Sequence, residues 1–495
     1  MRRAWLATPA VVVALVVAGA ATAAYEAPDT TTAAKDLNTP ACTAPTPDPS
    51  GKTKTYPWYH CYTPADINAA YGVDSLHSDG VMGAGQTIVL VDSYGSPTAA
   101  SDLRFFHDTF YPSLPNPSFE QVYPNGQPDY KNVGNGQSGS SGAAGWSGEA
   151  TLDIEWAYAI APLAHLILIA VPPAETEGVQ GFPNLFKAIG AEIDSTPAGT
   201  VFSMSFGVTE QTFGGAAQGQ TARFDAVFKK GVDKGDTFFA SSGDDGSLGV
   251  SKQHRETATY PFATDGWPAS SPYVTAVGGT QLQDGWTWDP TSDIPYLADK
   301  SLNPDYFNYT SGGDRNVVWN ESWLPAATGG GPSALYPRPT WQNGFLDAQG
   351  NHRLVPDVAW NAAVNGGVLV YITAFPQVQR AGWHVYGGTS AASPQVAALT
   401  ALAEQERAAA HKAPLGNIDG LLYGHPGWFT DVVGVTEGTA NSGKLLNNND
   451  WDFNGFGAAV TPDAVHGWPV LTGYDMTTGL GTPIGSAYVS GLAAS

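Results

Sequence analysis

Short apolar runs recur along the chain and predict buried strands. They are rich in Val, Ile, Leu and Phe, and they cover residues 86–92, 165–171, 201–206, 237–240, 273–277 and 368–372. Runs of this length without a polar face are typical of strands that lie inside a sheet covered on both sides. Each run is therefore expected to contribute one strand to the core.

Helical patterns lie between most of these runs. Apolar residues recur at helical spacing over 98–110, 148–161, 182–194, 218–234 and 390–410, and a short helix is expected to begin at Thr63-Pro64 and to reach Tyr71. Strands that alternate with helices predict an α/β fold, a doubly wound, mainly parallel sheet with helices on both faces. The span 283–345 and the tail 426–483 lack periodicity, and we expect long surface loops there.

The N-terminal residues predict export from the cell. Residues 1–24 combine Arg2-Arg3, an apolar run and a tract of small residues, as a signal peptide does. A membrane anchor is the alternative, but the run is short for one, and the arginine pair leaves the Sec and twin-arginine routes open. Residues 25–55 are predicted to form a linker or arm, and 56–495 a single domain.

Composition narrows the class of protein. The net charge is −23, from 45 acidic and 22 basic residues, which disfavours binding to nucleic acid. Gly (58), Pro (37) and Trp (15) are plentiful while charged residues make up 14% of the chain, which favours a rigid secreted globule over a disordered acidic chain. No later segment is apolar over the roughly 18 residues of a membrane span, so the mature protein is expected to be a soluble monomer. Cys42 and Cys61 are expected to form one disulfide outside the cytosol.

The helix predicted over 390–410 begins with a candidate nucleophile. Gly387-Gly388-Thr389-Ser390 precedes an almost wholly apolar helix, with Pro394 in its first turn. At such a helix start a serine hydroxyl lies beside unpaired N–H groups and the positive end of the helix dipole, where a nucleophile and an oxyanion site can coexist. Alternatively, Thr389 or Ser390 is only an N-cap. The pattern Gly-Thr-Ser-x-x-x-Pro resembles the nucleophile segment of the subtilisin-like serine peptidase clan.

A histidine base for Ser390 is not evident in the sequence. None of the ten histidines lies in a His-Gly-Thr setting, and His165 and His384, beside predicted strands, are interpreted as structural. Asp92, at the end of the first strand, resembles the acid of a subtilisin-type triad, but without a histidine it has nothing to orient.

Two carboxylates on the helix predicted over 148–161 are the better candidates. Glu149 and Asp153 are four residues apart, so they lie one turn apart on the same helix face. Both could simply interact with the helix dipole. Coupled carboxylates, however, can share a proton, so that one of them can accept the proton of a serine hydroxyl.

Taken together, the segments around Glu149/Asp153 and Ser390/Pro394 resemble the sedolisins, the serine-carboxyl peptidase family of the subtilisin-like clan. The resemblance runs from Tyr62 to about Pro483. Further landmarks that resemble the family are Ser-Met-Ser-Phe-Gly at 203–207, Ser-Ser-Gly-Asp-Asp-Gly at 241–246, Gly-Gly-Gly-Pro-Ser at 329–333, Pro-Asp-Val at 356–358 and Asp-Met-Thr-Thr-Gly-Leu-Gly at 475–481.

The resemblance implies a role for each matching residue. Ser390 would attack the peptide carbonyl, Glu149 would act as general base and then acid, and Asp153 would support Glu149. Asp244 matches the family's oxyanion residue. To donate a hydrogen bond Asp244 must be protonated, and because an ordinary Asp has a pKa of about 3.9, that favours acidic pH or a raised pKa. Alternatively, Asp244 is part of an ordinary Gly-Asp-Asp-Gly turn, as Asp245 is expected to be.

The resemblance also implies one structural Ca²⁺ ion. Its ligands would be Asp431 and Asp475 with the carbonyls of Val432, Leu471 and Gly473. Oxygen ligands from loops suit Ca²⁺. The residues after Asp431-Val432 depart from the family's usual pattern. Separately, 450–455 copies the first half of an EF-hand loop, but Thr461 stands where the bidentate Glu belongs, so we interpret that segment as a polar insertion.

These features predict a secreted, acid-acting serine endopeptidase that cleaves protein or peptide substrates. Tripeptidyl-peptidase activity, which also occurs in the family, stays open, as do an inactive scaffold that only binds peptides and a histidine-dependent subtilisin with unusual wiring. Family members carry a long N-terminal prodomain, whereas only residues 25–55 separate the predicted signal from the domain. Either activation differs in this chain, or folding does not need a prodomain.

Overall fold

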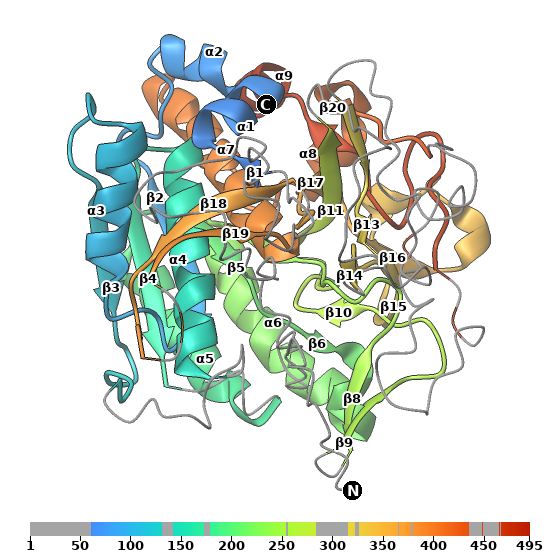
Figure 1. The fold of residues 1–495 in the computed structure, drawn as a ribbon. Helices are drawn as coiled ribbons and strands as arrows, with labels where there is room; N and C mark the ends of the chain where they lie inside the picture. The colour runs from blue at the N-terminus through green and yellow to red at the C-terminus, as the bar shows by residue number, and fades with distance from the viewer. Residues whose placement is uncertain are drawn as a thin grey trace, which may run out of the picture.

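A sheet of eight strands forms the centre of the fold (Figure 1). The computed structural model describes residues 61–495 except 131–141, 173–178, 254–255, 284–314, 322–325, 365, 378, 380, 435–447, 449–464 and 466. The strand order is β12-β11-β7-β5-β2-β4-β3, with β17 also paired to β11. The strands are β2 (Thr87–Ser93), β3 (Ser118–Val122), β4 (His165–Val171), β5 (Val201–Met204), β7 (Thr237–Ser241), β11 (Thr275–Gln283), β12 (Arg315–Val318) and β17 (Val358–Asn361).

Helices cover both faces of this sheet. One face carries α4 (Ala143–Ile160) and α7 (Thr389–Ala409), which pack against each other, and α3 (Ala99–Phe110) packs against α4. The other face carries α5 (Phe182–Ser195) and α6 (Ala217–Lys234). The predicted α/β architecture is confirmed, because all neighbours in this sheet pair in parallel except β12 with β11.

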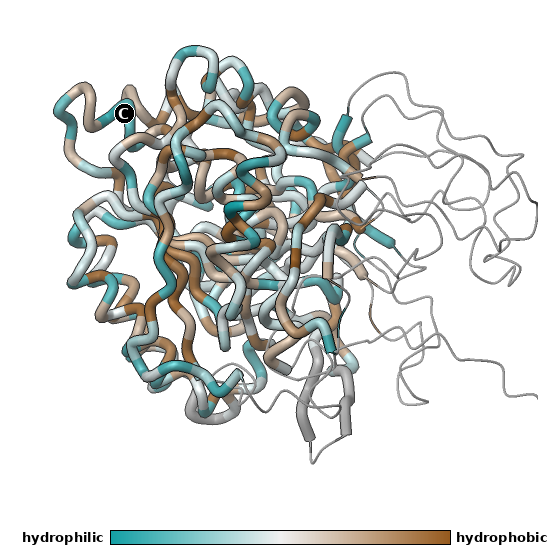
Figure 2. The backbone as a smooth tube through the Cα atoms, turned by 60° about the vertical axis from the view of Figure 1, so that its left-hand side comes forward, coloured by the Kyte–Doolittle hydropathy of each residue, from teal (hydrophilic) through white to brown (hydrophobic). Residues whose placement is uncertain are grey.

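Strand β2 shows why the runs are apolar at every position. Side chains alternate between the faces of a strand. Ile88 and Leu90 therefore join the core under α4 and α7, whereas Val89 and Val91 join the core under α5 and α6. In Figure 2 the hydrophobic segments gather in the interior and hydrophilic segments lie mostly outside.

Two predictions about strands were wrong. The run at 368–372 does not enter the main sheet. As β18 (Gly367–Ile372) it pairs with β1 (Cys61–Tyr62) and β19 (Gly382–Tyr386) in a separate sheet. Nor is the described part of 283–345 a surface excursion, because β12 extends the main sheet and Trp319, which follows it, is fully buried.

The remaining elements are short and lie around the sheet. The further strands are β6 (Val208–Thr209), β8 (Val250–Gln253), β9 (Glu256–Thr259), β10 (Gly266–Trp267), β13 (Asn320–Glu321), β14 (Ala326–Ala327), β15 (Gly331–Pro337), β16 (His352–Val355), β20 (Phe429–Thr430) and β21 (Thr482–Pro483). The further helices are α1 (Pro64–Ala70), α2 (Val73–Ser78), α8 (Asp419–Gly424), α9 (Gly485–Ala494) and the 3₁₀ turns η2 (Glu210–Ala216), η5 (Thr340–Gln342), η6 (Asp347–Gln349) and η7 (Pro426–Trp428).

Helix α9 completes the packing around α7. It lies beside α2 in Figure 1, and the N–H of Gly485 donates to the carbonyl of Tyr71 at 2.9 Å. The guanidinium of Arg407, near the end of α7, donates to the carbonyl of Leu492 at 2.8 Å. Segments from the two ends of the described chain therefore meet on the back of α7.

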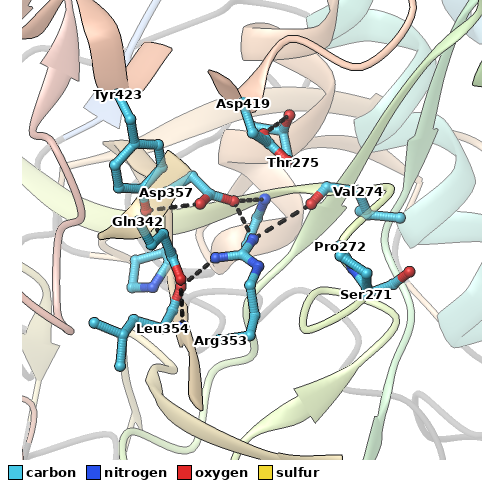
Figure 3. A network of polar contacts seen from close by, with 12 residues as sticks. Ser271, Pro272, Val274, Thr275, Gln342, Arg353, Leu354, Asp357, Asp419 and Tyr423 are labelled. Atoms are coloured by element: carbon cyan, nitrogen blue, oxygen red, sulfur yellow. Dashed lines mark hydrogen bonds and ion pairs between the residues drawn. The ribbon is translucent and has the colours of Figure 1, made fainter. Parts of the chain in front are cut away.

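A buried ion pair joins β16 to the segments around it (Figure 3). Arg353 Nη2 lies 2.5 Å from Asp357 Oδ2, and both side chains are fully buried. Asp357 also accepts the N–H of Ala276 at 2.8 Å and the hydroxyl of Tyr423 on α8 at 2.8 Å. One carboxylate thus connects the start of β11, the end of β16 and α8.

Several predictions fall outside the described residues. These are the signal peptide, the arm 25–55, Cys42, and the segment 450–455 with Thr461. Among the residues that the structure describes, no helix combines the length and the hydropathy that a membrane crossing requires.

Candidate active site

Ser390 is fully buried in the first turn of α7. Two glycines place it there. The N–H of Gly388 donates to the carbonyl of Ala362 at 2.6 Å, and Gly388 has φ of +104°. A Cβ on Gly387 would lie 2.6 Å from that same carbonyl. Larger residues would therefore push the helix start away from β17 and displace the hydroxyl.

Helix α4 carries the two carboxylates against the helix of Ser390. Glu149 is 1% exposed and Asp153 is fully buried, one turn further along. α4 packs on α7, and Gly148 faces the hydroxyl of Tyr386, four residues before Ser390. The residue before Glu149 thus lies against the strand that leads into the nucleophile.

Asp153 sits in a group of acids. Its Oδ1 accepts the hydroxyl of Ser205 at 2.9 Å. Burial raises the pKa of Asp153 well above its ordinary value, the nearby carboxyls of Asp92 and Glu149 raise it further, and the bond from Ser205 lowers it. Asp153 is therefore expected to hold a proton well above pH 4, while a single negative charge is the easiest for this group to carry.

The strand ends explain why these residues meet. β2 and β5 are parallel neighbours, with Val91 opposite Met204, so Asp92 and Ser205 continue from the same edge of the sheet. After β2 the chain crosses to β3 and β4 on one side, and β5 then adds on the other. Crevices at such a switch point, outside the carboxyl ends of parallel strands, are where open α/β sheets bind ligands.

Asp244 follows β7 at this edge and reaches the start of α7. Its Oδ1 accepts both the N–H and the hydroxyl of Thr389, each at 2.7 Å. Burial raises the pKa of Asp244 to about 7, and the two bonds from Thr389 oppose that rise. Asp244 can therefore be a neutral hydrogen-bond donor in acid. Burial also raises the pKa of its neighbour Asp245, to about 6.

The two histidines named from the sequence occupy other surroundings. His165 bonds Ser118 at 2.8 Å and Glu120 at 3.1 Å, both on β3. The ring of His384 on β19 lies 6.3 Å from that of Tyr386. The groups that act on the pKa of Asp153 are carboxyls and a hydroxyl.

The residues proposed for calcium converge on one loop. Asp431 accepts the N–H of Gly473 at 2.8 Å, and Asp475 Oδ2 accepts the N–H of Leu471 at 2.9 Å. Asp475 Oδ1 accepts the N–H groups of Thr477 and Thr478 and both of their hydroxyls. The Oδ2 atoms and the loop carbonyls make an all-oxygen donor set, which fits a hard cation.

Sequence reasoning did not assign a role to Ser205 or Thr389. Both stand inside motifs that resemble the family, after β5 and immediately before the nucleophile. Their position at the carboxyl ends of neighbouring strands or at a helix start was the available signal.

Comparison with known proteins identifies the family. The subtilase family profile matches residues 164–417. The chain is 28% identical over 437 residues to kumamolisin from Bacillus sp. (strain MN-32), covering 86% of this chain and 62% of that protein. The chain belongs to the subtilase family, in its sedolisin branch.

Other relatives agree with this assignment. Sedolisin from Pseudomonas sp. (strain 101) is 28% identical over 285 residues, which are 56% of this chain and 42% of that protein. Human tripeptidyl-peptidase 1 is 27% identical over 339 residues, 65% of this chain and 49% of that protein. The chain thus spans less than two thirds of the length of these relatives.

The fold matches a solved structure of the same branch. Pseudomonas sedolisin, a serine-carboxyl proteinase solved with two molecules of pseudo-iodotyrostatin, superposes with a TM-score of 0.61 at 23% identity. The match covers 88% of this chain and 99% of that one. The subtilisin-like fold predicted from the sequence is confirmed.

Proposed function

We propose that this protein is a serine-carboxyl endopeptidase that acts in acid. The observation that carries the proposal is the buried pair Glu149 and Asp153 on α4, packed against the helix that begins at Ser390. Membership of the sedolisin branch supports the same chemistry. The site supplies a nucleophile, a carboxylate base and a neutral donor for an oxyanion.

Acylation would use each group once. Glu149, as carboxylate, accepts the hydroxyl proton of Ser390 while Oγ bonds to the carbonyl carbon of the substrate. The π electrons of that carbonyl move to its oxygen, which accepts hydrogen bonds from protonated Asp244 and from the N–H groups that a helix start leaves unpaired. Glu149 then returns the proton to the leaving amine as the C–N bond breaks.

Deacylation would reverse these roles. Glu149 takes a proton from a water molecule, whose oxygen attacks the acyl carbon. When the tetrahedral intermediate collapses, the C–Oγ bond breaks and Glu149 gives the proton back to Ser390. Asp153 keeps its proton and hydrogen-bonding capacity beside Glu149, so that the pair carries one negative charge through the cycle.

Acid activity follows from Asp244. Only the protonated form can donate to the oxyanion, and that form is lost as the pH rises through the pKa of about 7. Activity is therefore expected to be high in acid and to fall toward neutrality.

Peptide cleavage measured from pH 3 to pH 9 tests this function. Ser390→Ala and Glu149→Gln should each lose at least a thousandfold in kcat, while Thr400→Val on the same helix should keep the rate within about threefold. Near-full activity of either site variant overturns the proposal. Absence of cleavage at every pH would indicate a peptide-binding scaffold, and a neutral-to-alkaline optimum would indicate a histidine base.

The substrate class proposed is internal peptide bonds. Cleavage of a peptide blocked at its N-terminus separates the two activities of the family, because a tripeptidyl-peptidase requires a free amine. Release of tripeptides alone, with blocked peptides left intact, would replace the endopeptidase assignment.

A structural Ca²⁺ ion is proposed for the loop of Asp431 and Asp475. Their carboxylates and the carbonyls of Val432, Leu471 and Gly473 would hold it, and it would fasten β20 to the segment before β21. The ion is not given a part in the reaction.

Secretion is proposed on the signal-like residues 1–24. A disulfide between Cys42 and Cys61 would then tie the arm to β1, where Cys61 is buried. N-terminal sequencing of the exported protein and mass spectrometry of unreduced peptides test these two points.

A further inference from the structure

One oxygen of the Asp244 carboxyl is committed to Thr389. Oδ1 accepts the backbone N–H of Thr389 at 2.7 Å and its hydroxyl, also at 2.7 Å. Both donors belong to the first residue of α7, immediately before Ser390. Asp244 therefore caps the helix of the nucleophile from outside that helix.

The hydroxyl of Thr389 can point in only one direction. Its Oγ1 lies 3.1 Å from the N–H of Gly243, which can only donate. Oγ1 must accept this bond, and its own hydrogen is left for Asp244 Oδ1. The methyl group of Thr389 faces Gly279 on β11, where an added Cβ would lie 3.4 Å from Cγ2, and this packing fixes the rotamer.

The second carboxyl oxygen is in a different position. Oδ2 is buried and has no hydrogen-bond partner among the described residues. Two hydrogens already point at Oδ1, so the proton of the neutral acid can be accommodated only on Oδ2. A buried donor without a partner is costly, which makes Oδ2 ready to bond an oxyanion formed at Ser390.

We propose that Thr389 is a positioning residue, which holds Oδ1 of Asp244 and so directs the acid proton on Oδ2 toward the oxyanion. This inference rests on the proposed function, because it concerns the same reaction. It adds a role for a hydroxyl that never touches the substrate.

The same bonds set the alkaline limit of activity. Each bond from Thr389 stabilises the charged form of Asp244 and lowers its pKa, against the effect of burial and of the neighbouring charge of Asp245. Removing the hydroxyl must therefore raise this pKa. The alkaline limb of the kcat profile should then move to higher pH even as the maximal rate falls.

The test compares Thr389→Val with Thr389→Ser. Valine keeps the shape and the methyl group but removes the hydroxyl donor. Loss of a whole oxyanion donor costs about 10²–10³ in kcat, so misdirecting one should cost about tenfold or more, with KM little changed. Serine keeps the hydroxyl and should stay within about threefold of the original chain, with the original alkaline limb.

The matched control is Thr400→Val. Thr400 is a fully buried threonine on the same helix, and its hydroxyl bonds the carbonyl of Val396 and the hydroxyl of Tyr488. This change should leave kcat and both limbs of the pH profile in place. A loss common to Thr389→Val and Thr400→Val would indicate damaged packing and overturn the proposal.

Two further outcomes decide the matter. If Thr389→Val does not fold, Thr389→Ala and Thr389→Ser form the comparison, because both lack the methyl group and only serine keeps the hydroxyl. Equal kcat and equal alkaline limbs in that pair overturn the proposal, whereas a rate about tenfold lower in alanine supports it. If Ser390→Ala and Glu149→Gln abolish activity while the Thr389 variants behave as the original chain, the proposed function stands and this inference alone fails.

Discussion

The hydroxyl of Ser205 donates a hydrogen bond of 2.9 Å to Oδ1 of Asp153, and this bond joins the end of β5 to the middle of α4. It is the contact among the described residues that favours the charged form of Asp153, against burial and two neighbouring carboxyls. Ser205 therefore helps to determine how tightly the acid group holds its proton.

Ser205→Ala should move the acid limb of kcat/KM to higher pH. Without the bond the pKa of Asp153 rises further, so the group of acids loses its first proton later and Glu149 becomes a base only at higher pH. The control is Ser203→Ala, earlier on the same strand, whose hydroxyl lies 3.0 Å from that of Ser393. An unmoved acid limb in Ser205→Ala would contradict this interpretation.

Gly148→Ala should reduce activity through Tyr386. An added Cβ would approach the tyrosine hydroxyl to under 3.0 Å, closer than real Cβ atoms come, so the segment leading to Ser390 must shift. We expect a loss of about tenfold in kcat and about 1–3 kcal/mol in stability. Tyr386→Phe in the same chain removes the obstructing atom and should restore most of the loss.

Gly190→Ala is the control for this pair. Gly190 lies in α5, and its added Cβ would meet only a Val227 carbon at 3.8 Å. Alanine there should raise stability by about 0.5–1 kcal/mol and leave activity unchanged. Failure of the double change to recover activity would indicate that Gly148 is needed for another reason.

Stability should fall as the pH rises from about 4 to about 7. Burial raises the pKa of Asp225 and Asp236 to about 6 and that of Glu404 to about 7. Between the ordinary and the raised pKa, the unfolded chain binds fewer protons than the folded one, so increasing pH favours unfolding. Thermal melts across this range should show the highest midpoint near pH 4.

Glu404→Gln isolates one part of that slope. Glu404 accepts the N–H of Leu415 at 2.7 Å, and an amide oxygen can accept the same bond. The variant should lose less stability between pH 4.5 and pH 7 than the original chain. Stability that increases with pH in this window would contradict the prediction.

Arg353→Met should be among the most destabilising single changes in the described chain. It leaves Asp357 charged and buried without its ion-pair partner, which costs about 3–5 kcal/mol. Arg104→Ala is the control, since its pair with Asp108 is about half exposed and should be worth less than about 1 kcal/mol. Denaturant unfolding measures both changes, and equal losses would contradict the assignment.

Chelation should lower the thermal midpoint if the Asp431 loop holds Ca²⁺. A ligand that binds only the folded chain stabilises it in proportion to the logarithm of its concentration. Added Ca²⁺ should therefore raise the midpoint of the original chain and leave that of Asp431→Ala unchanged. Equal responses of the two chains to Ca²⁺ and to chelator would remove the ion from this loop.

The regular elements were predictable because their patterns are local. The helix predicted over 218–234 is α6, at 217–234, and the run at 165–171 is β4 to the residue. Helix α4 begins five residues before its predicted start at 148, because its first turns hold Ala, Gly and Ser without an apolar period. Strand β12 was missed because a short edge strand among loops has no run of its own.

The contacts within the site were harder to predict than its members. Ser390, Glu149 and Asp244 stand in recognisable motifs, and their roles stay proposals. The bonds from Thr389 to Asp244 and from Ser205 to Asp153 join residues 145 and 52 positions apart. Such pairs depend on the strand order, which local patterns do not contain.

The packing of α9 has a consequence for biosynthesis. Arg407 on the nucleophile helix bonds the carbonyl of Leu492, and Gly485 bonds Tyr71 near the beginning of the described chain. A growing polypeptide cannot make either contact until the ribosome has passed these positions. Ser390 therefore emerges before the support of its helix is complete, and a nascent protease of this design gains its cutting ability only when synthesis has reached α9.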